Sequence, residues 1–223
     1  LVTLCATRPE PYLEIVKFLP DGLIITFEVT VLSLLCTLPI GLLTGLGRLS
    51  RNPVINLIAS TYVEIIRGVP LLVQLFYIYY ALGRIIQVPP MVSAVIAISF
   101  CYGAYMGEVF RAGILSVPKG QTEAARSLGM SFSRILAKIV IPQALRSSVL
   151  PMTNLFIAVM LTTALGSQVP LKPQELTGVV SYINTRSLGG VVAFFISALG
   201  YLGTAFVVSH IGNYIDKKVR ILR

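Results

Sequence analysis

The stretch EAARSLGMSFSRILAKIVIP, residues 123–142, is a polar and patterned insert in a chain that otherwise suits a lipid environment. Of the 223 residues, 55% are hydrophobic, and the mean hydropathy is +0.83. The stretch nevertheless holds Glu123, Arg126, Arg134 and Lys138, and apolar runs flank it on both sides. Because charges are costly inside a bilayer, we expect this insert to lie outside the membrane.

Five charge-free apolar runs account for much of the rest of the chain. Only 12% of the residues are charged, about half of the roughly 25% that is typical of soluble domains. A bilayer-spanning helix needs about 20 predominantly apolar residues, and five such runs are too many for one soluble core of this size. We therefore expect an all-α membrane protein, a single domain over residues 1–223 with about five transmembrane helices. The expected spans cover about residues 22–47, 68–84, 88–110, 147–168 and 188–212, and a polar loop covers about 113–145.

The basic residues are unequally distributed between the two sides of this expected domain. The formal net charge is +9, and an excess of Lys and Arg marks the cytoplasmic loops of membrane proteins. No basic stripe interleaved with aromatic residues occurs, so nucleic-acid binding is not expected. The bias predicts an outside N-terminus, a cytoplasmic C-terminus and a cytoplasmic 113–145 loop. Twelve basic residues fall on the cytoplasmic side (Arg48, Arg51, Arg111, Lys119, Arg126, Arg134, Lys138, Arg146, Lys217, Lys218, Arg220 and Arg223) and five on the other (Arg8, Lys17, Arg84, Lys172 and Arg186).

Helix-breaking residues refine the expected spans. The sequence Pro20-Asp21-Gly22 is expected to precede the first span. Pro70 cannot donate to the carbonyl four residues earlier, and it disfavours a helical conformation at the residue before it. Residues 53–67 are therefore expected to form a separate or kinked helix that leads into the membrane, and Pro89-Pro90 is expected to start the third span.

The polar insert itself has the pattern of two helices joined by a glycine. Residues 123–128 favour a helix, and Gly129 is a natural C-terminal cap. Ser131 is a plausible N-cap for a second helix, which Pro142 is expected to end. In that helix the apolar residues recur at helical spacing and form one stripe. The periodicity alone favours an amphipathic hairpin that lies on the membrane surface. The stripe consists of Phe132, Ile135, Leu136 and Ile139.

The amino-acid sequence of the insert resembles the EAA loop of ABC-importer permeases. In that loop E-A-A is followed by three residues, Gly, nine residues and I-x-L-P; here the spacing is the same, with Ile141 in place of Leu. Residues 62–82, 104–125 and 141–146 are similar to permeases of the polar amino-acid (histidine/glutamine-type) uptake family. The resemblance extends from Gly22 to the C-terminus and implies the type I ABC-importer permease architecture.

This resemblance implies a set of partners and a location. The EAA loop would act as a coupling helix that docks on a separate ATP-binding subunit, which would bind ATP and Mg²⁺. A second permease subunit, identical or homologous, and an extracytoplasmic substrate-binding protein would complete an importer of a polar amino acid in the bacterial cytoplasmic (inner) membrane. The chain has no G-x-x-x-x-G-K-[ST] phosphate loop, so it is not expected to be an enzyme. The implied coupling residues are Glu123, Ala124, Ala125 and Gly129.

Polar groups within the spans are candidates for a substrate pathway. Ionisable residues at membrane depth usually face the interior of a helix bundle. Glu64 and Arg67, like Glu108 and Arg111, are three residues apart, so each pair can form an ion pair on one helix face or contact substrate. An ion-driven secondary transporter or channel that uses Glu64 and Glu108 is the alternative function. Where many members of the family have Lys-Asp-Thr-Ser-Leu, residues 161–165 lack the charged pair. The uncharged candidates are Gln74, Asn154, Thr162 and Thr163.

Overall fold

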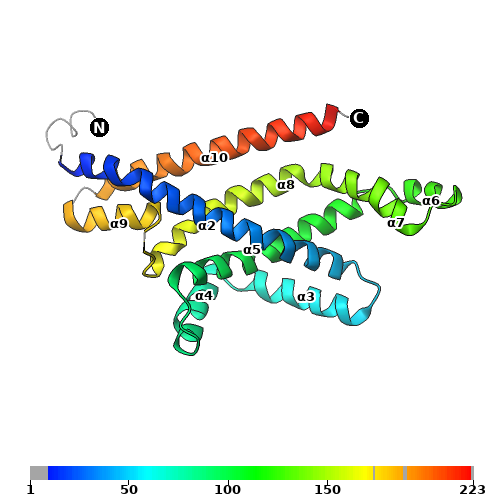
Figure 1. Cartoon of the computed structure of the whole chain (residues 1–223), viewed down its shortest axis with the longest axis horizontal. Helices are drawn as coiled ribbons and strands as arrows, with labels where there is room; N and C mark the ends of the chain where they lie inside the picture. The colour runs from blue at the N-terminus through cyan, green and yellow to red at the C-terminus, as the bar shows by residue number, and fades with distance from the viewer. Residues whose placement is uncertain (1–9, 173, 188–189, 222–223) are drawn as a thin grey trace. The chain divides into compact units, whose positions relative to one another are not determined.

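The computed structural model describes residues 10–172, 174–187 and 190–221, and its secondary structure in these ranges is helical (Figure 1). The expected all-α fold is therefore confirmed. The helices are α2 (Glu10–Arg48), α3 (Pro53–Gly68), α4 (Leu71–Phe76), η1 (Tyr77–Ala81), η2 (Leu82–Arg84), α5 (Pro90–Leu115), α6 (Lys119–Ser127), α7 (Phe132–Ile135), η3 (Leu136–Val140), α8 (Ile141–Thr162), η4 (Thr163–Gln168), α9 (Leu176–Ser187) and α10 (Gly190–Ile221).

The long apolar helices agree with an expectation of about five membrane spans. Four described segments are long and apolar enough to cross a bilayer, and a fifth results if α3 and the helices after it count as one broken span. The break falls at Val69, which is extended (φ −107°, ψ 129°), as expected before a proline. The separate helix expected over residues 53–67 is thus confirmed as α3. The four segments are Pro20–Arg48, Pro90–Leu115, Phe132–Gln168 and Phe194–Val219.

The first helix does not begin where the helix-breaking residues predicted. Helix α2 runs without interruption through Pro20, Asp21 and Gly22. Gly22 is buried, and a Cβ at this position would lie 3.0 Å from Leu176 Cα. Close packing against the start of α9 therefore favours a regular helix here, which outweighs the single backbone hydrogen bond that Pro20 removes.

Two compact units make up the chain, and the longest helices contribute to both. In the first unit, Leu75, Ala94, Ala97 and Val169 form a buried apolar cluster. The backbone N–H of Leu176 also donates to Thr26 Oγ1 at 3.3 Å, which links α9 to α2. This unit comprises Leu1–Leu34, Pro70–Ile98 and Ala158–Val207, and the second comprises Leu35–Val69, Ser99–Ile157 and Val208–Arg223.

In the second unit, α2 and α5 approach each other closely through glycines on both helices. A Cβ on Gly45 would lie 2.8 Å from the carbonyl oxygen of Gly107, and a Cβ on Gly107 would lie 2.8 Å from Thr44 Cγ2. Small residues at such crossings let two backbones pack tightly where lipid offers no hydrophobic driving force. The crossing holds the end of α2 beside α5, on which the charged residues Glu108 and Arg111 lie.

Candidate functional site

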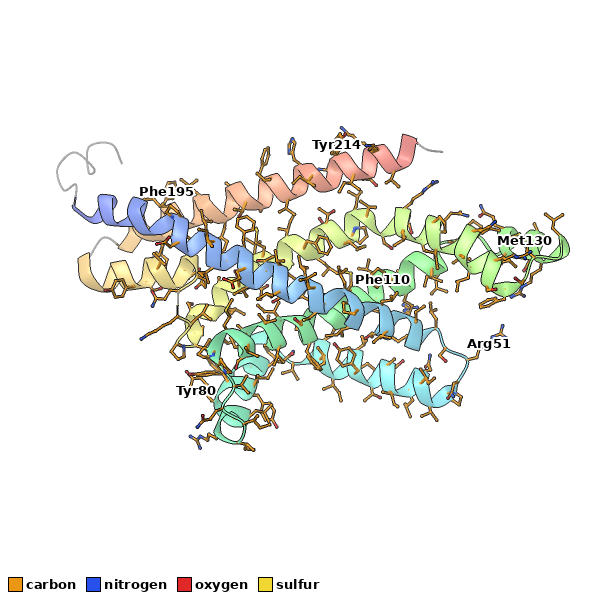
Figure 2. The ribbon with its side chains drawn as sticks, viewed as in Figure 1. Arg51, Tyr80, Phe110, Met130, Phe195 and Tyr214 are labelled. Atoms are coloured by element: carbon orange, nitrogen blue, oxygen red, sulfur yellow. The ribbon has the colours of Figure 1, made fainter. Side chains whose placement is uncertain are left out.

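The polar insert folds as the expected helix–glycine–helix unit, here called the hairpin (residues 119–140, α6 to η3). Gly129 adopts a left-handed conformation with φ +76°. Its N–H donates to Arg126 O at 2.9 Å, and the N–H of Met130 donates to Ala125 O at 3.1 Å. These two bonds form a Schellman motif, in which the position that Gly129 occupies favours glycine. The expected C-cap is confirmed, and Figure 2 shows Met130 at the turn.

A small apolar core holds the hairpin together. Val117, Ala125, Ile135 and Val140 are buried in one cluster, against which Leu136 and Ile139 also pack. Ala125 is only 4% exposed, so its small side chain serves the packing of α6 on the second half of the hairpin. The four residues implied by the resemblance therefore divide: Ala125 faces inward, and the others face outward. The outward three are Glu123, Ala124 and Gly129, all exposed.

Two large apolar side chains at the turn were not recognised as contact residues from the sequence. Leu128 is 83% exposed and Phe132 is 68% exposed. Phe132 was assigned to the apolar stripe together with Ile135, Leu136 and Ile139, but it comes directly after the N-cap position Ser131 and, unlike those three, lies outside the cluster. Exposed apolar groups beside a rigid turn are typical of protein interaction surfaces. Both residues could have been recognised in the sequence as exposed contact residues, because they lie on either side of the glycine at the turn.

The second half of the hairpin differs from the regular helix that its periodicity predicted. Residues 136–140 form a π-turn, in which the N–H of Ile141 donates to Leu136 O. Pro142 does not end this helix; it lies in the first turn of α8, which continues to Thr162. Since Pro142 has no N–H for the carbonyl of Lys138, a wider turn lets the hydrogen-bond pattern pass the proline. Ser131 takes the expected N-cap position, but its side chain makes no capping hydrogen bond.

A charged cluster joins α2 to α5 in the second unit. Arg111 Nη2 lies 3.0 Å from Glu108 Oε2, which confirms the ion pairing predicted from their spacing. Arg48, at the end of α2, forms a second ion pair with Glu108 Oε1. The backbone oxygen of Arg48 also accepts from Asn56 Nδ2 at 2.6 Å, which adds α3 to the network. The role of Arg48 was missed because it lies 60 residues before Glu108.

Replacing Glu108 with glutamine should lower the free energy of unfolding by about 1–3 kcal/mol, since two partly buried guanidinium groups lose their shared carboxylate. Thermal unfolding of the purified chain in detergent measures the change. The matched control is Glu64→Gln on α3, where the exposed side chain predicts a change within about 0.5 kcal/mol. Equal shifts in both variants would contradict a stabilising role for the cluster.

The second expected ion pair, between Glu64 and Arg67, does not form. Glu64 and Arg67 are both exposed, and the Arg67 guanidinium lies 4.9 Å from the centroid of the Tyr105 ring. Close by, Tyr62 Oη donates to the backbone oxygen of Phe100 at 2.5 Å. The aromatic face of Tyr105 is therefore the partner of Arg67 and contributes a cation–π contact between α3 and α5.

The uncharged pathway candidates are divided between the two units. Gln74 is half-buried in α4 of the first unit, and Asn154 is exposed on α8 of the second. The hydroxyl groups of Thr162 and Thr163 donate to nearby backbone carbonyls, at Ala158 O and Met160 O. These local bonds use the proton of each hydroxyl group.

A buried carboxylate in the first unit was not recognised from the sequence at all. Glu175 is 1% exposed and accepts hydrogen bonds from the N–H groups of Thr177 (2.7 Å) and Gly178 (2.8 Å) at the start of α9. Tyr201 Oη on α10 donates to the same carboxylate at 2.9 Å. Glu175 lies outside the candidate spans. Burial raises the pKa of its carboxyl group, against the donors, which lower it.

Comparison with known proteins finds a family model and named relatives that match most of this chain. Residues 37–221 match the family described as "Binding-protein-dependent transport system inner membrane component". The L-cystine transport system permease protein TcyB of Bacillus subtilis is 37% identical over 203 residues, which cover 90% of this chain and 86% of that protein. The probable glutamine ABC transporter permease protein GlnP of the same organism is 34% identical, covering 88% and 91%.

The solved structures agree with the sequence relatives. The fold matches a crystal structure of an amino acid ABC transporter with histidines at a TM-score of 0.85 and 33% identity, covering 92% of this chain and 97% of that one. An inward-facing MetNI methionine ABC transporter matches at a TM-score of 0.72 and 20% identity, covering 95% and 98%. The more distant match supports the fold alone.

Proposed function

The chain belongs to the family of binding-protein-dependent transport system inner membrane components, and on this premise we propose that it moves a polar amino acid through the bacterial inner membrane as part of an ATP-driven importer. As a member, it is a multi-pass permease subunit rather than the ATPase. The amino-acid class is supported by the named transport of cystine and glutamine by its relatives. The ion-driven transporter or channel is not favoured.

The hairpin is the site that couples this permease to a separate ATP-binding subunit. The observation that carries this assignment is its geometry: a Schellman turn at Gly129 presents exposed groups from a hairpin with its own core. Glu123 offers a charged acceptor and Ala124 permits close approach, while Leu128 and Phe132 supply apolar contact area. A rigid element of this kind can transmit a rigid-body movement of the ATPase to the spans.

Orientation and assembly follow from the coupling role. The hairpin and the C-terminus lie in the cytoplasm and the N-terminus lies outside, which is supported by the unequal distribution of Lys and Arg. The ATP-binding subunit binds ATP and Mg²⁺, a second permease subunit completes the pathway, and an extracytoplasmic protein delivers the substrate. Gln74, Asn154, Thr162, Thr163 and Glu64 are the pathway candidates, whereas Glu108 serves the ion-pair cluster.

Charge reversal at the exposed Glu123 tests the coupling role. In vesicles that contain the chain with its ATPase and binding protein, Glu123→Lys should reduce ATP-driven uptake about tenfold or more, the loss expected for one charged contact of about 1.5–3 kcal/mol. Co-purification of the ATPase should fall in parallel. Lys119→Gln, at the exposed start of the same helix, is the control and should leave both measurements near the wild-type value.

Two results would contradict this function. Full uptake by the Glu123→Lys complex would remove the hairpin from coupling. Uptake in ATP-depleted vesicles under an imposed ion gradient would favour the ion-driven alternative. Measuring uptake of a panel of amino acids by the intact complex, with its binding protein, then identifies the substrate within the proposed class.

A further inference from the structure

An open cleft of about 950 Å³ lies between the segment that follows α5, the hairpin, α8 and the last turns of α10. Its volume is near the upper end of the range of about 300–1,000 Å³ that ligand pockets occupy. The lining residues all belong to the second unit. They do not include the exposed turn residues Leu128 and Phe132, so the cleft is distinct from the surface assigned to the ATPase.

Hydrogen bonds between side chains hold the walls of the cleft together. Gln143 Nε2 of α8 donates to Gln121 Oε1 of α6. Ser116 Oγ and Ser147 Oγ lie 3.0 Å apart, which joins the chain just after α5 to α8. All four residues are part of the lining. The cleft is therefore a built feature with defined walls and polar groups at its surface.

The cleft presents more positive than negative charge. Lys138 from η3 and Arg146 from α8 contribute two cations to the lining. Asp216 from α10 contributes one carboxylate, which is 9% exposed. Lysine and arginine together are suited to a phosphate group, since arginine can form two parallel hydrogen bonds to it.

Lys138 reaches this cleft from within the π-turn of the hairpin. Lys138 lies within the π-turn at residues 136–140, whereas Arg134, four residues earlier, precedes the turn and does not line the cleft. A regular helix would have placed both cations on one face, as their spacing of four predicts. Single π-turns inside α-helices occur frequently at functional sites.

The cleft also has apolar lining, part of which comes from the membrane spans. Leu150 and Pro151 belong to the span Phe132–Gln168, and Val219 ends the span Phe194–Val219. A ligand that carries both a phosphate and an apolar portion uses both kinds of lining, whereas free phosphate uses only the cations. Basic pockets between spans on the cytoplasmic side are known to suit lipid head groups.

We propose that this cleft binds a phosphate group, namely the phosphodiester of an anionic phospholipid in the cytoplasmic leaflet, through Lys138 and Arg146. The choice of leaflet rests on the proposed function, which puts the hairpin in the cytoplasm. The binding itself depends only on the lining. A lipid bound in this cleft contacts both the hairpin and the spans. Its binding can therefore influence how movement of the hairpin is transmitted to the spans.

The experiment uses spin-labelled phosphatidylglycerol in phosphatidylcholine vesicles that contain the assembled permease–ATPase complex. Electron spin resonance gives the affinity for phosphatidylglycerol relative to phosphatidylcholine. The double variant Lys138→Gln/Arg146→Gln should lower this relative affinity roughly tenfold, since each cation near a charged surface contributes strongly. The matched control, Lys119→Gln/Arg134→Gln, removes one lysine and one arginine that do not line the cleft and should keep the selectivity of the wild type.

The outcomes separate the possible ligands. Equal loss in both double variants would overturn the proposal, because the attraction would then come from the general positive charge. Inorganic phosphate or a polar amino acid could displace the labelled lipid while the acyl chains had no effect on its binding. The ligand of the cleft would then be a soluble molecule and not a lipid. Chemical reduction of labels in the outer leaflet alone identifies the leaflet. Because this readout needs no uptake, it succeeds or fails separately from the coupling test.

Discussion

Replacing Gly129 with valine should reduce ATP-driven uptake roughly tenfold to a hundredfold and weaken association with the ATPase. Gly129 has φ +76°, a conformation that costs a residue with a Cβ of order 1–3 kcal/mol and a β-branched one the most. The space around a Cβ there is open, with no atom within 4 Å. The loss would therefore come from the backbone, through a hairpin turn that no longer presents Leu128 and Phe132 correctly.

Two other substitutions separate this explanation from a steric one. Gly129→Asn should retain most of the uptake, because asparagine tolerates the left-handed conformation. A Cβ added at Gly120 in α6 would likewise meet no atom within 4 Å, but the φ of Gly120 is not in the left-handed region, so Gly120→Val should cost little. Uptake by Gly129→Val equal to that of Gly120→Val would show that the turn is not needed for coupling.

The features predicted correctly from the sequence are those that depend on near neighbours in the chain. The left-handed conformation of Gly129 follows from its place after α6, and the Glu108–Arg111 ion pair follows from helical spacing. The apolar runs predicted long apolar helices, because a bilayer requires helices of a certain length. In each case one local property is sufficient to determine the structure.

The failures arise where contacts that the local pattern does not reveal decide the structure. Pro142 was expected to end a helix, but a π-turn before it accommodates the missing N–H. Arg48 approaches Glu108 only because glycines let α2 and α5 cross closely. The pairing of Arg67 with the ring of Tyr105 likewise depends on how α3 packs against α5. No periodicity in the sequence carries this information.

Glu175 illustrates the same limit and gives the second large prediction. Its carboxylate accepts from two backbone N–H groups of α9 and from Tyr201, 26 residues away on α10. Glu175→Ala leaves these donors without their buried acceptor, at about 1–3 kcal/mol for each unsatisfied group. With some relaxation, we expect a total loss of about 3 kcal/mol and a fall of roughly 6–12 °C in the unfolding temperature in detergent.

The pH dependence of this variant series tests the cause. Because burial raises the pKa of Glu175 above its ordinary value of 4.5, the folded state binds the proton more tightly than the unfolded state does. This tighter proton binding adds to the free energy of unfolding. The added stability is fully present below about pH 4.5 and is lost as the pH rises through the pKa of Glu175 in the folded state. Glu175→Gln does not titrate, so the advantage of the wild type over this variant should decrease as the pH rises above about 4.5. An advantage that grows with pH would mean that the donors from Thr177, Gly178 and Tyr201 outweigh burial, and that the carboxylate is held in its charged form.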